Sequence, residues 1–474
     1  MTKDKDERLD TDGLSRRAVL RTMGIAGAAL AAGPAFLAAC GGDNSGSSGA
    51  TTTKAAGGGA ATTAAGASTS AGGGGAASGD VGTQLASLLK IDPATSGKGM
   101  TFKMGNVLAL TGSGSFYGKT MSRGTDLAVE HIKAAGGPDI QVKYYDHKSG
   151  DAAAGQQAIT ELGQAGYPAK LASYVDDLGA MLAGTAQYKM FTLDGGGGTS
   201  IFGQGQPFFW GTRAITPNDV LPGLFKWTKT TYPNAKTVGL TGWDIGEPNN
   251  TTIKTDVLKK IADAGYQFNN LYELFPVGTQ DFSAVRPKIK ANEPDLLLCG
   301  GYGQDPGSFL NQSQTAGLKA TILGFEFTPD GVNASKGAYD KVGWTFAYDY
   351  FDADNPISPL AKLFVSEFKK KYTDSPDFYA ADFYENTLVM WEVIRRVLKK
   401  GGNINDGAQL DQALQDNLTV VSVYGGDANT VGTYTLDPKT HSVIKRGMGV
   451  FEYKGGKVTA KAFFDIGGAD YKTA

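Results

Sequence analysis

Two kinds of apolar pattern alternate along the chain from about residue 100. A mostly apolar segment, residues 102–110, indicates a buried strand. A helical pattern follows over 119–135, in which Ala128 and Ile132 share one face. The helix is expected to end at Gly136. The same alternation predicts strands at 140–145, 170–174, 190–193, 208–210, 237–240, 268–275, 295–299 and 320–325, and helices at 151–165, 251–264, 282–291 and 307–316.

The alternation comes in two series, and it predicts an α/β fold with two doubly wound lobes of parallel sheet. Two helices, 359–372 and 378–400, follow the second series, and a strand-rich tail ends in a hairpin around 454–457. Ligands of open α/β sheets bind beyond the carboxyl ends of the strands. The loops predicted to be functional are therefore 111–118, 174–180, 194–199, 242–248, 300–306 and 325–331.

The N-terminus has the pattern of an export signal. A charged segment with Arg16-Arg17 precedes a run of small apolar residues that closes with Leu37-Ala38-Ala39-Cys40. These parts predict a signal peptide over 1–39. The paired arginines resemble a twin-arginine signal, with Tat and Sec export as the alternatives. A short transmembrane anchor is disfavoured, because the apolar run is short and contains glycine and proline.

Leu-Ala-Ala-Cys also resembles the lipobox of bacterial lipoproteins. The resemblance implies that Cys40 carries a lipid and anchors the protein to the cell membrane on its outer side. Residues 41–80 contain almost nothing but Gly, Ala, Ser and Thr, which bury too little apolar surface to fold. We therefore expect residues 40–95 to form a disordered tether between the anchor and the folded part.

Composition removes several classes of function. The 45 Lys+Arg and 47 Asp+Glu residues nearly balance, so no basic excess suggests a nucleic-acid partner. Two cysteines and three histidines offer neither a disulfide framework nor a metal cluster, and we expect no cofactor. The chain contains no Gly-x-Ser-x-Gly elbow and no His-Glu-x-x-His helix, so we expect no catalytic residues and no enzyme.

Several short segments, taken in order, resemble the branched-chain amino-acid binding proteins of ABC importers, which have the type I periplasmic-binding fold. The resemblance covers residues 100–465. It is carried by Leu110-Thr111-Gly112-Ser113-Gly114-Ser115-Phe116-Tyr117-Gly118, Ala128-Val129, Ala134-Ala135-Gly136-Gly137, Tyr145-Asp146, Gln280-Asp281-Phe282-Ser283, Cys299-Gly300-Gly301-Tyr302, Ala316-Gly317-Leu318-Lys319 and Gly324-Phe325-Glu326.

The resemblance implies two lobes joined by a hinge that the chain crosses three times. Lobe one would comprise 100–214 and 345–418, and lobe two 215–344 and 419–474. A ligand would bind in the cleft between the lobes and close it. The protein would act as a monomer that delivers its ligand to an importer permease.

The resemblance also implies ligand contacts. Tyr117 would line the cleft, Tyr302 would form an aromatic wall, and Glu326 would grip a ligand ammonium. Position after a predicted strand adds Trp243, and the glycine-rich loop before the first helix adds Ser115. The loops after the third and fourth strands of lobe one supply the remaining candidates, Asp176, Asp177, Gly196 and Gly198.

Two of these loops depart from the family pattern. Asp176 and Asp177 stand where the family offers hydroxyls and amides to a ligand carboxylate, and Asp194-Gly195-Gly196-Gly197-Gly198-Thr199 replaces a Ser/Thr-containing segment. A carboxylate at such a position would repel a ligand carboxylate. We therefore expect a ligand with a positive or hydrogen-bond-donating group and an apolar or ring-shaped body, such as an amino acid, an amide, a polyol or sugar, or an aromatic compound. The pattern places no arginine in a cleft loop to balance an anionic ligand, although Arg213 is a candidate to lie close to the cleft.

Three other functions compete with import. A sensor lipoprotein that reports its ligand to a membrane receptor would have the same fold and cleft. An extracytoplasmic hydrolase with two α/β lobes is a remote alternative. Gly112-x-Gly114-x-x-x-Gly118 opens a helix after a strand as dinucleotide fingerprints do, but it lacks their spacing.

Overall fold

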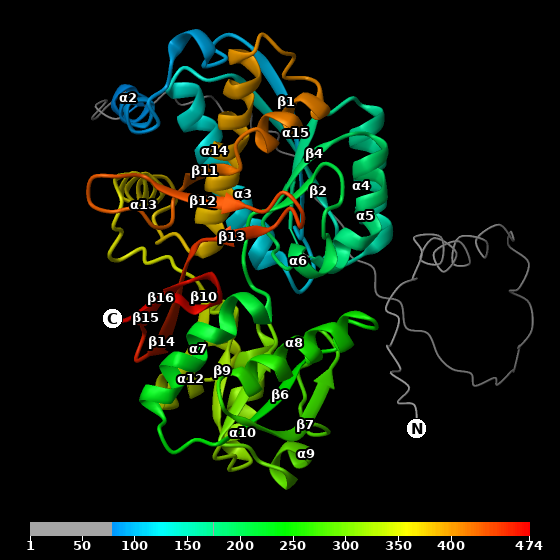
Figure 1. Cartoon of the computed structure of the whole chain (residues 1–474), viewed down its shortest axis with the longest axis vertical. Helices are drawn as coiled ribbons and strands as arrows, with labels where there is room; N and C mark the ends of the chain where they lie inside the picture. The colour runs from blue at the N-terminus through cyan, green and yellow to red at the C-terminus, as the bar shows by residue number, and fades with distance from the viewer. Residues whose placement is uncertain (1–77, 174) are drawn as a thin grey trace, which may run out of the picture. The chain divides into compact units, whose positions relative to one another are not determined.

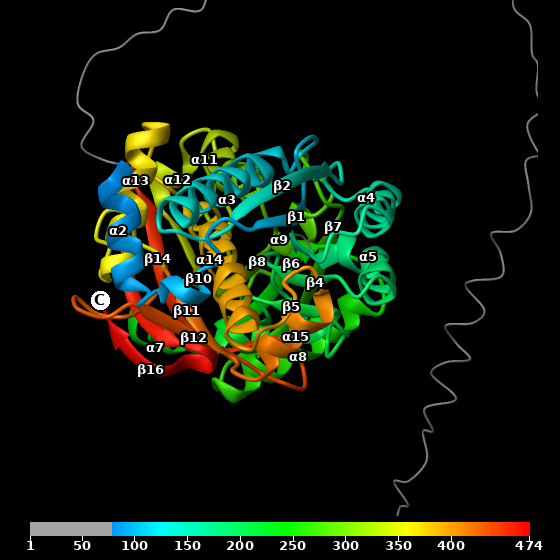
Figure 2. The ribbon, with the colours of Figure 1, turned by 90° about the horizontal axis from the view of Figure 1, so that it is seen from above.

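The computed structural model describes residues 78–173 and 175–474. The predicted signal peptide, the lipid-bearing Cys40 and most of the predicted tether lie outside the described residues. The prediction that the tether extends to residue 95 is wrong, because α2 (Ser78–Leu88) is a helix and a 3-10 turn covers Pro93–Thr95. Helix α2 lies beside α3 (Ser115–Ala134) and α13 (Pro359–Tyr372) (Figure 2), and it buries Leu85 completely. The folded part therefore begins before the first strand.

The first sheet has five parallel strands in the order β2-β1-β3-β4-β5, which is a doubly wound arrangement (Figure 1). Its helices are α3 and α14 (Phe378–Lys399) on one face and α4 (Ala152–Gln164) and α5 (Val175–Gln187) on the other. The strands are β1 (Thr101–Leu108), β2 (Asp139–Asp146), β3 (Ala169–Ala172), β4 (Phe191–Asp194) and β5 (Phe209–Gly211).

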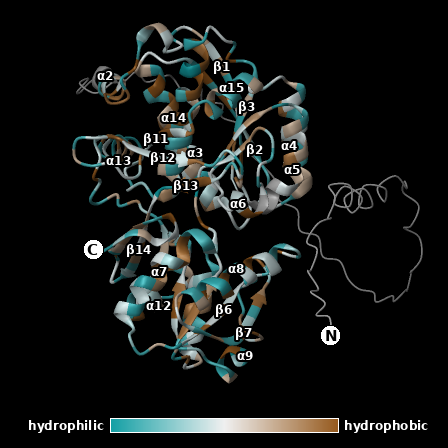
Figure 3. Ribbon diagram, in the orientation of Figure 1, coloured by the Kyte–Doolittle hydropathy of each residue, from teal (hydrophilic) through white to brown (hydrophobic). Residues whose placement is uncertain are grey.

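Alternation along β1 explains the two layers of helices. Met104 and Leu108 pack in the core shared with α3 and α14, whereas Val107 packs in a separate core with Ile159 and Leu162 of α4. Successive side chains of a strand point to opposite faces, so a fully apolar strand is buried on both sides. Figure 3 shows the corresponding hydrophobic segments in α14.

The second sheet has eight strands in the order β16-β15-β14-β10-β9-β8-β6-β7. The strands from β7 to β10 are parallel, and β14, β15 and β16 continue the sheet as an antiparallel meander. The strands are β6 (Thr237–Trp243), β7 (Gln267–Phe275), β8 (Leu296–Gly300), β9 (Thr321–Gly324), β10 (Trp344–Asp349), β14 (Gly447–Lys454), β15 (Lys457–Asp465) and β16 (Ala469–Thr473).

Helices cover both faces of the second sheet. One core contains Leu224 of α7 and Val257 of α8 together with Leu240 and Leu298 of the strands. The opposite core contains Phe309 of α10 and Cys299. The helices are α7 (Pro217–Thr231), α8 (Asn249–Asp263), α9 (Arg286–Ala291), α10 (Asp305–Thr315), α11 (Pro329–Ala334) and α12 (Ala338–Val342).

Two of the predicted lobe boundaries are displaced. β10 was assigned to lobe one, but it pairs with β9 and β14 of the second sheet. Residues 419–445 were assigned to lobe two, but β11 packs on α14 of lobe one. The ring of His441 also stacks on Trp210 of lobe one, with the ring centroids 3.8 Å apart. These residues form a separate sheet of β11 (Thr419–Ser422), β12 (Gly432–Leu436) and β13 (Val443–Lys445), next to α15 (Gly407–Gln415). Lobe one is therefore the first sheet with α13–α15 and β11–β13, and lobe two is the second sheet with its helices.

A buried ion cluster joins the three connections between the lobes. Arg213 follows β5, Asp349 ends β10 and Arg446 precedes β14, so each residue lies at one crossing. Asp349 accepts a hydrogen bond from Nε of Arg213 at 3.2 Å and forms an ion pair with Arg446, whose Nε lies 2.7 Å from its carboxylate. Arg446 also donates to Glu385 of α14 at 2.7 Å. Burial raises the pKa of the nearby Asp382 carboxyl well above its usual value, which favours its neutral form beside these charges.

Candidate solute-binding cleft

A cavity of about 200 Å³ lies between the two lobes. Its wall combines Tyr117, Arg213 and Tyr379 of lobe one with Trp243 and Glu326 of lobe two. The lobe-two residues follow strands β6 and β9 at their carboxyl ends, where open α/β sheets bind ligands. This volume accommodates a small organic solute rather than a few ordered waters.

Glu326 is held by three donors from the protein. Oε1 accepts from the Tyr117 hydroxyl at 2.5 Å and from the Gly303 backbone N–H at 2.7 Å, and Oε2 accepts from the Tyr379 hydroxyl at 2.5 Å. The residue is only 3% exposed. Burial raises the pKa of Glu326, and the three hydrogen bonds act in the opposite direction. Because both tyrosines belong to lobe one and Glu326 belongs to lobe two, these hydrogen bonds connect the two lobes across the cleft.

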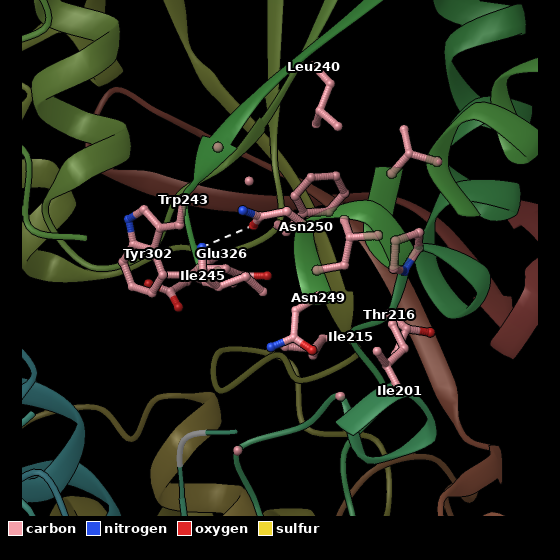
Figure 4. Close-up of a pocket in the computed structure, with 18 of the residues that line it drawn as sticks. Ile201, Ile215, Thr216, Leu240, Trp243, Ile245, Asn249, Asn250, Tyr302 and Glu326 are labelled. Carbon is pink, nitrogen blue, oxygen red and sulfur yellow. Dashed lines mark hydrogen bonds between the residues drawn. The ribbon is translucent and has the colours of Figure 1, made fainter. Parts of the chain in front are cut away.

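Aromatic rings form the wall beside these hydrogen bonds. Trp243 and Tyr302 meet edge to face with their centroids 5.1 Å apart (Figure 4). The Trp243 indole donates to Asp305 at 2.8 Å, and burial raises the pKa of Asp305 to about 6. A smaller cavity of about 30 Å³ borders the same two rings, where Ser113 of lobe one faces lobe two.

Arg213 brings a positive charge to the cavity wall. Its side chain is buried, and the guanidinium carbon lies 4.5 Å from the ring centre of Phe378 and 5.1 Å from that of Tyr379. Burial opposes the charge, but Tyr379 and Asp349 raise the pKa of Arg213 above its usual value, so the group stays charged. Nη2 has no hydrogen-bond partner among the described residues.

Most of the rest of the cavity is an apolar chamber between α8 and the second sheet, with the polar residues Thr216, Asn249 and Asn250 also on its wall. Strands β6 and β7 contribute Leu240 and Leu274, α8 contributes Ile253 and Val257, and Phe325 follows β9. Lobe one adds Ile201 and Ile215, because α6 (Thr199–Phe202) lies against α8. Figure 4 shows Leu240 and Ile201 well away from the group of Trp243, Tyr302 and Glu326, with Asn249 and Asn250 between them and Thr216 beside Ile201. The charged groups of the wall therefore lie at one end of the cavity, and most of the hydrocarbon lies at the other.

The cavity brings together six of the residues expected from the sequence. Gly198 lies at φ 78°, a left-handed conformation that favours glycine and allows α6 to begin beside the cavity. Ser115 is exposed at the start of α3 and does not line the cavity, so its prediction as a ligand contact is not supported. Asp176 and Asp177 lie in α5 instead of the expected loop, and their side chains are outside the described part of the chain. The six are Tyr117, Gly196, Gly198, Trp243, Tyr302 and Glu326.

Sequence reasoning missed several polar residues of the cavity, among them Arg213, Tyr379, Asn249 and Asn250, and most of its apolar wall. Arg213 follows the predicted strand 208–210, so the loop after that strand deserved inclusion among the functional loops. Tyr379 begins a long helix, and no sequence signal relates it to Glu326. The apolar residues of α8 have helical spacing. That spacing predicts a helix face packed in the protein core as well as one that lines a ligand cavity.

The profile of the periplasmic binding protein family matches residues 101–458. This chain belongs to that family. The match confirms the resemblance noted in the sequence and extends over nearly all of both lobes.

Curated relatives agree with this assignment. A Leu/Ile/Val-binding protein homolog of Brucella melitensis is 26% identical over 190 residues, 40% of this chain and 46% of that protein. Another Leu/Ile/Val-binding protein homolog, from Brucella abortus, is 24% identical over 300 residues, 58% of this chain and 71% of that protein. The first of these matches spans about half the length of the relative.

Solved structures share the fold of this family member. An isoleucine complex of a branched-chain amino acid transporter substrate binding protein from Streptococcus pneumoniae has a TM-score of 0.63 and 21% identity, covering 76% of this chain and 98% of that chain. A benzoate complex of a solute binding protein from R. palustris has a TM-score of 0.64 and 18% identity. The match covers 79% of this chain and 98% of that chain. The predicted α/β fold with two doubly wound lobes is confirmed.

The described residues include neither a membrane-spanning helix nor a metal-binding group of side chains. None of the helices there is long and apolar enough to cross a membrane. No group of His, Cys, Asp or Glu side chains in the same residues is arranged to hold a metal ion.

Proposed function

We propose that this protein is an extracytoplasmic solute-binding lipoprotein that captures a small ligand between its lobes and delivers it to an ABC importer. The observation that carries the proposal is the cavity of about 200 Å³, whose wall comes from both lobes. A ligand there touches both lobes at once and so stabilises the closed arrangement relative to an open one.

The N-terminal sequence supports the location. An export signal over 1–39, the lipobox cysteine Cys40 and a Gly/Ala/Ser/Thr-rich tether would keep the binding domain outside the cell and near a permease in the membrane. Mass spectrometry of the mature N-terminus should find a diacylglyceryl group on Cys40. A mature protein that retains residues 30–40 would contradict the lipid anchor.

Binding is tested first by thermal unfolding of the purified chain against a panel of amino acids, amides, sugars, polyols, and aliphatic and aromatic acids. A ligand at a hundred times its dissociation constant adds about 2.7 kcal/mol to the stability of the folded state. Small-angle scattering should then show a smaller radius of gyration with the hit than without it. If no solute in the panel stabilises the protein, the proposed function is wrong.

Import is tested separately in cells. Uptake of the labelled hit should fall when the gene is deleted and should return with the wild-type gene. It should not return with the Ile253→Trp variant, whose added ring fills the chamber. Uptake that is unchanged by the deletion would favour a sensor, because a sensor binds its ligand without carrying it.

A further inference from the structure

Among the described residues that line the cavity, Glu326 is the one acidic group, and the protein already uses most of its acceptor positions. Glu326 accepts from Tyr117, Tyr379 and the backbone of Gly303, which occupies three of about four acceptor positions of a carboxylate. An ammonium group needs acceptors for three donors when it leaves water. Glu326 does not supply them in this arrangement, so the cleft is poorly suited to the ammonium of an amino acid.

The unsatisfied group at the same end is a donor. Arg213 is 5% exposed and lines the cavity, and its Nη2 lacks a partner among the described residues, whereas Nε is bound to Asp349 at 3.2 Å. A buried guanidinium N–H without an acceptor is costly. Nη2 itself is enclosed by the protein, but another part of the Arg213 side chain lines the cavity. A ligand oxygen placed against the guanidinium there gains a charge-assisted hydrogen bond, and a carboxylate makes the strongest such bond.

The remaining wall determines what the rest of the ligand can be. Leu240, Ile253, Val257 and Leu274 surround the far end with hydrocarbon. A polar or charged group there would lose its hydration without a hydrogen-bond partner, whereas a branched or ring-shaped hydrocarbon gains from leaving water.

We propose that the cleft selects an apolar carboxylate without an α-ammonium group, with its carboxylate at Arg213 and its hydrocarbon body in the chamber beside α8. The inference rests on the proposed solute-binding function and narrows its ligand class. It also replaces the earlier expectation of a ligand cation held by Glu326.

The direct test compares ligands that share one hydrocarbon skeleton. Calorimetry of the purified wild-type chain would use leucine, 4-methylpentanoate, 4-methylpentanamide and 3-methylbutylamine. 4-Methylpentanoate, which is leucine without its ammonium, should bind about ten- to hundredfold more tightly than leucine or the amide. The amine should bind most weakly. Leucine or the amine binding as tightly as 4-methylpentanoate would overturn the inference, and an equally tight amide would remove the charge pairing with Arg213.

Variants locate the carboxylate. Arg213→Met should weaken binding of 4-methylpentanoate about ten- to hundredfold while affecting the amide less. Arg123→Met is the matched control, because Arg123 forms a surface ion pair with Asp374 at 2.9 Å, away from the cavity wall. If Arg213→Met fails to fold, the comparison of the four ligands on the wild-type chain decides the question by itself.

The outcomes separate this inference from the proposed function. If none of the four ligands binds but a panel solute without a carboxylate closes the lobes, the ligand class is wrong and the solute-binding function stands. If no solute of any class binds, both proposals fail. Tight binding of a larger apolar acid, with loss on Arg213→Met, supports both.

Discussion

The two lobes contribute different chemistry to one cavity. Lobe one supplies the directional groups, which are the Arg213 guanidinium and the hydroxyls of Tyr117 and Tyr379. Lobe two supplies most of the hydrocarbon wall, the acceptor Glu326 and the side-chain amides of Asn249 and Asn250. An apolar surface gains free energy in any orientation of the ligand, whereas a hydrogen bond requires a defined geometry. We infer that lobe two binds the body of the ligand and that lobe one contacts the polar end of the ligand as the cleft closes.

The largest effect is expected where the two lobes are joined. Arg446 bridges Asp349 and Glu385 and is 2% exposed, so Arg446→Met leaves buried carboxylates without their partner. Breaking a buried ion pair typically costs about 3–5 kcal/mol of unfolding free energy. Denaturant unfolding measures the loss. The control is Lys445→Met, because Lys445 is exposed on the adjacent position, and it should change stability little. Equal stability of both variants would show that the cluster does not hold the lobes together.

The next effect concerns the apolar side of the comparison. Ile253→Trp places a large ring in the chamber and should weaken ligand binding about tenfold or more, because the hydrocarbon body of the ligand loses its space. Thr252→Trp puts the same ring on an exposed position of the same helix and should leave affinity unchanged. Calorimetry with the best ligand distinguishes them. An unaffected Ile253→Trp variant would place the ligand outside the chamber.

A homologous series of ligands sharpens the same point. Each buried methylene is worth about 0.8 kcal/mol, so straight-chain carboxylates should gain about fourfold in affinity per added methylene until the chamber is full. Dissociation constants from butanoate to octanoate measure the gain. A flat series would mean that the body of the ligand stays in water.

The smallest effect is a pH dependence at the polar side. Glu326 faces Arg213, Tyr117 and Tyr379, and burial already raises its pKa. A ligand carboxylate nearby raises that pKa further, so binding favours proton uptake and affinity should fall a few-fold from pH 6 to pH 8. Glu326→Gln should keep tight binding of the carboxylate and lose the pH dependence. A large loss of binding in Glu326→Gln would instead support a ligand cation.

Much of the architecture was predictable because its signals are local. The helix at 359–372 coincides with α13, and the strands at 140–145 and 268–275 fall within β2 and β7. The apolar period of a strand or helix needs only a few neighbouring residues. Helix α7 was missed, although Thr216 and Asp219 form a capping box at its start. β10 was placed in the wrong lobe because an apolar strand does not reveal which sheet it joins.

The sequence by itself determined the type of most elements and half of the aromatic cleft wall, and it predicts the export signal that ends at Cys40. Only the tertiary structure decided which groups remain available to a ligand. Tyr117 and Glu326 lie 209 residues apart and Arg213 and Asp349 lie 136 apart, yet each pair is hydrogen-bonded. Such pairings depend on how the two sheets and the long helix α14 pack, which no local pattern records. The tertiary contacts thus commit Glu326 to the protein and place the Arg213 side chain on the wall of the cavity.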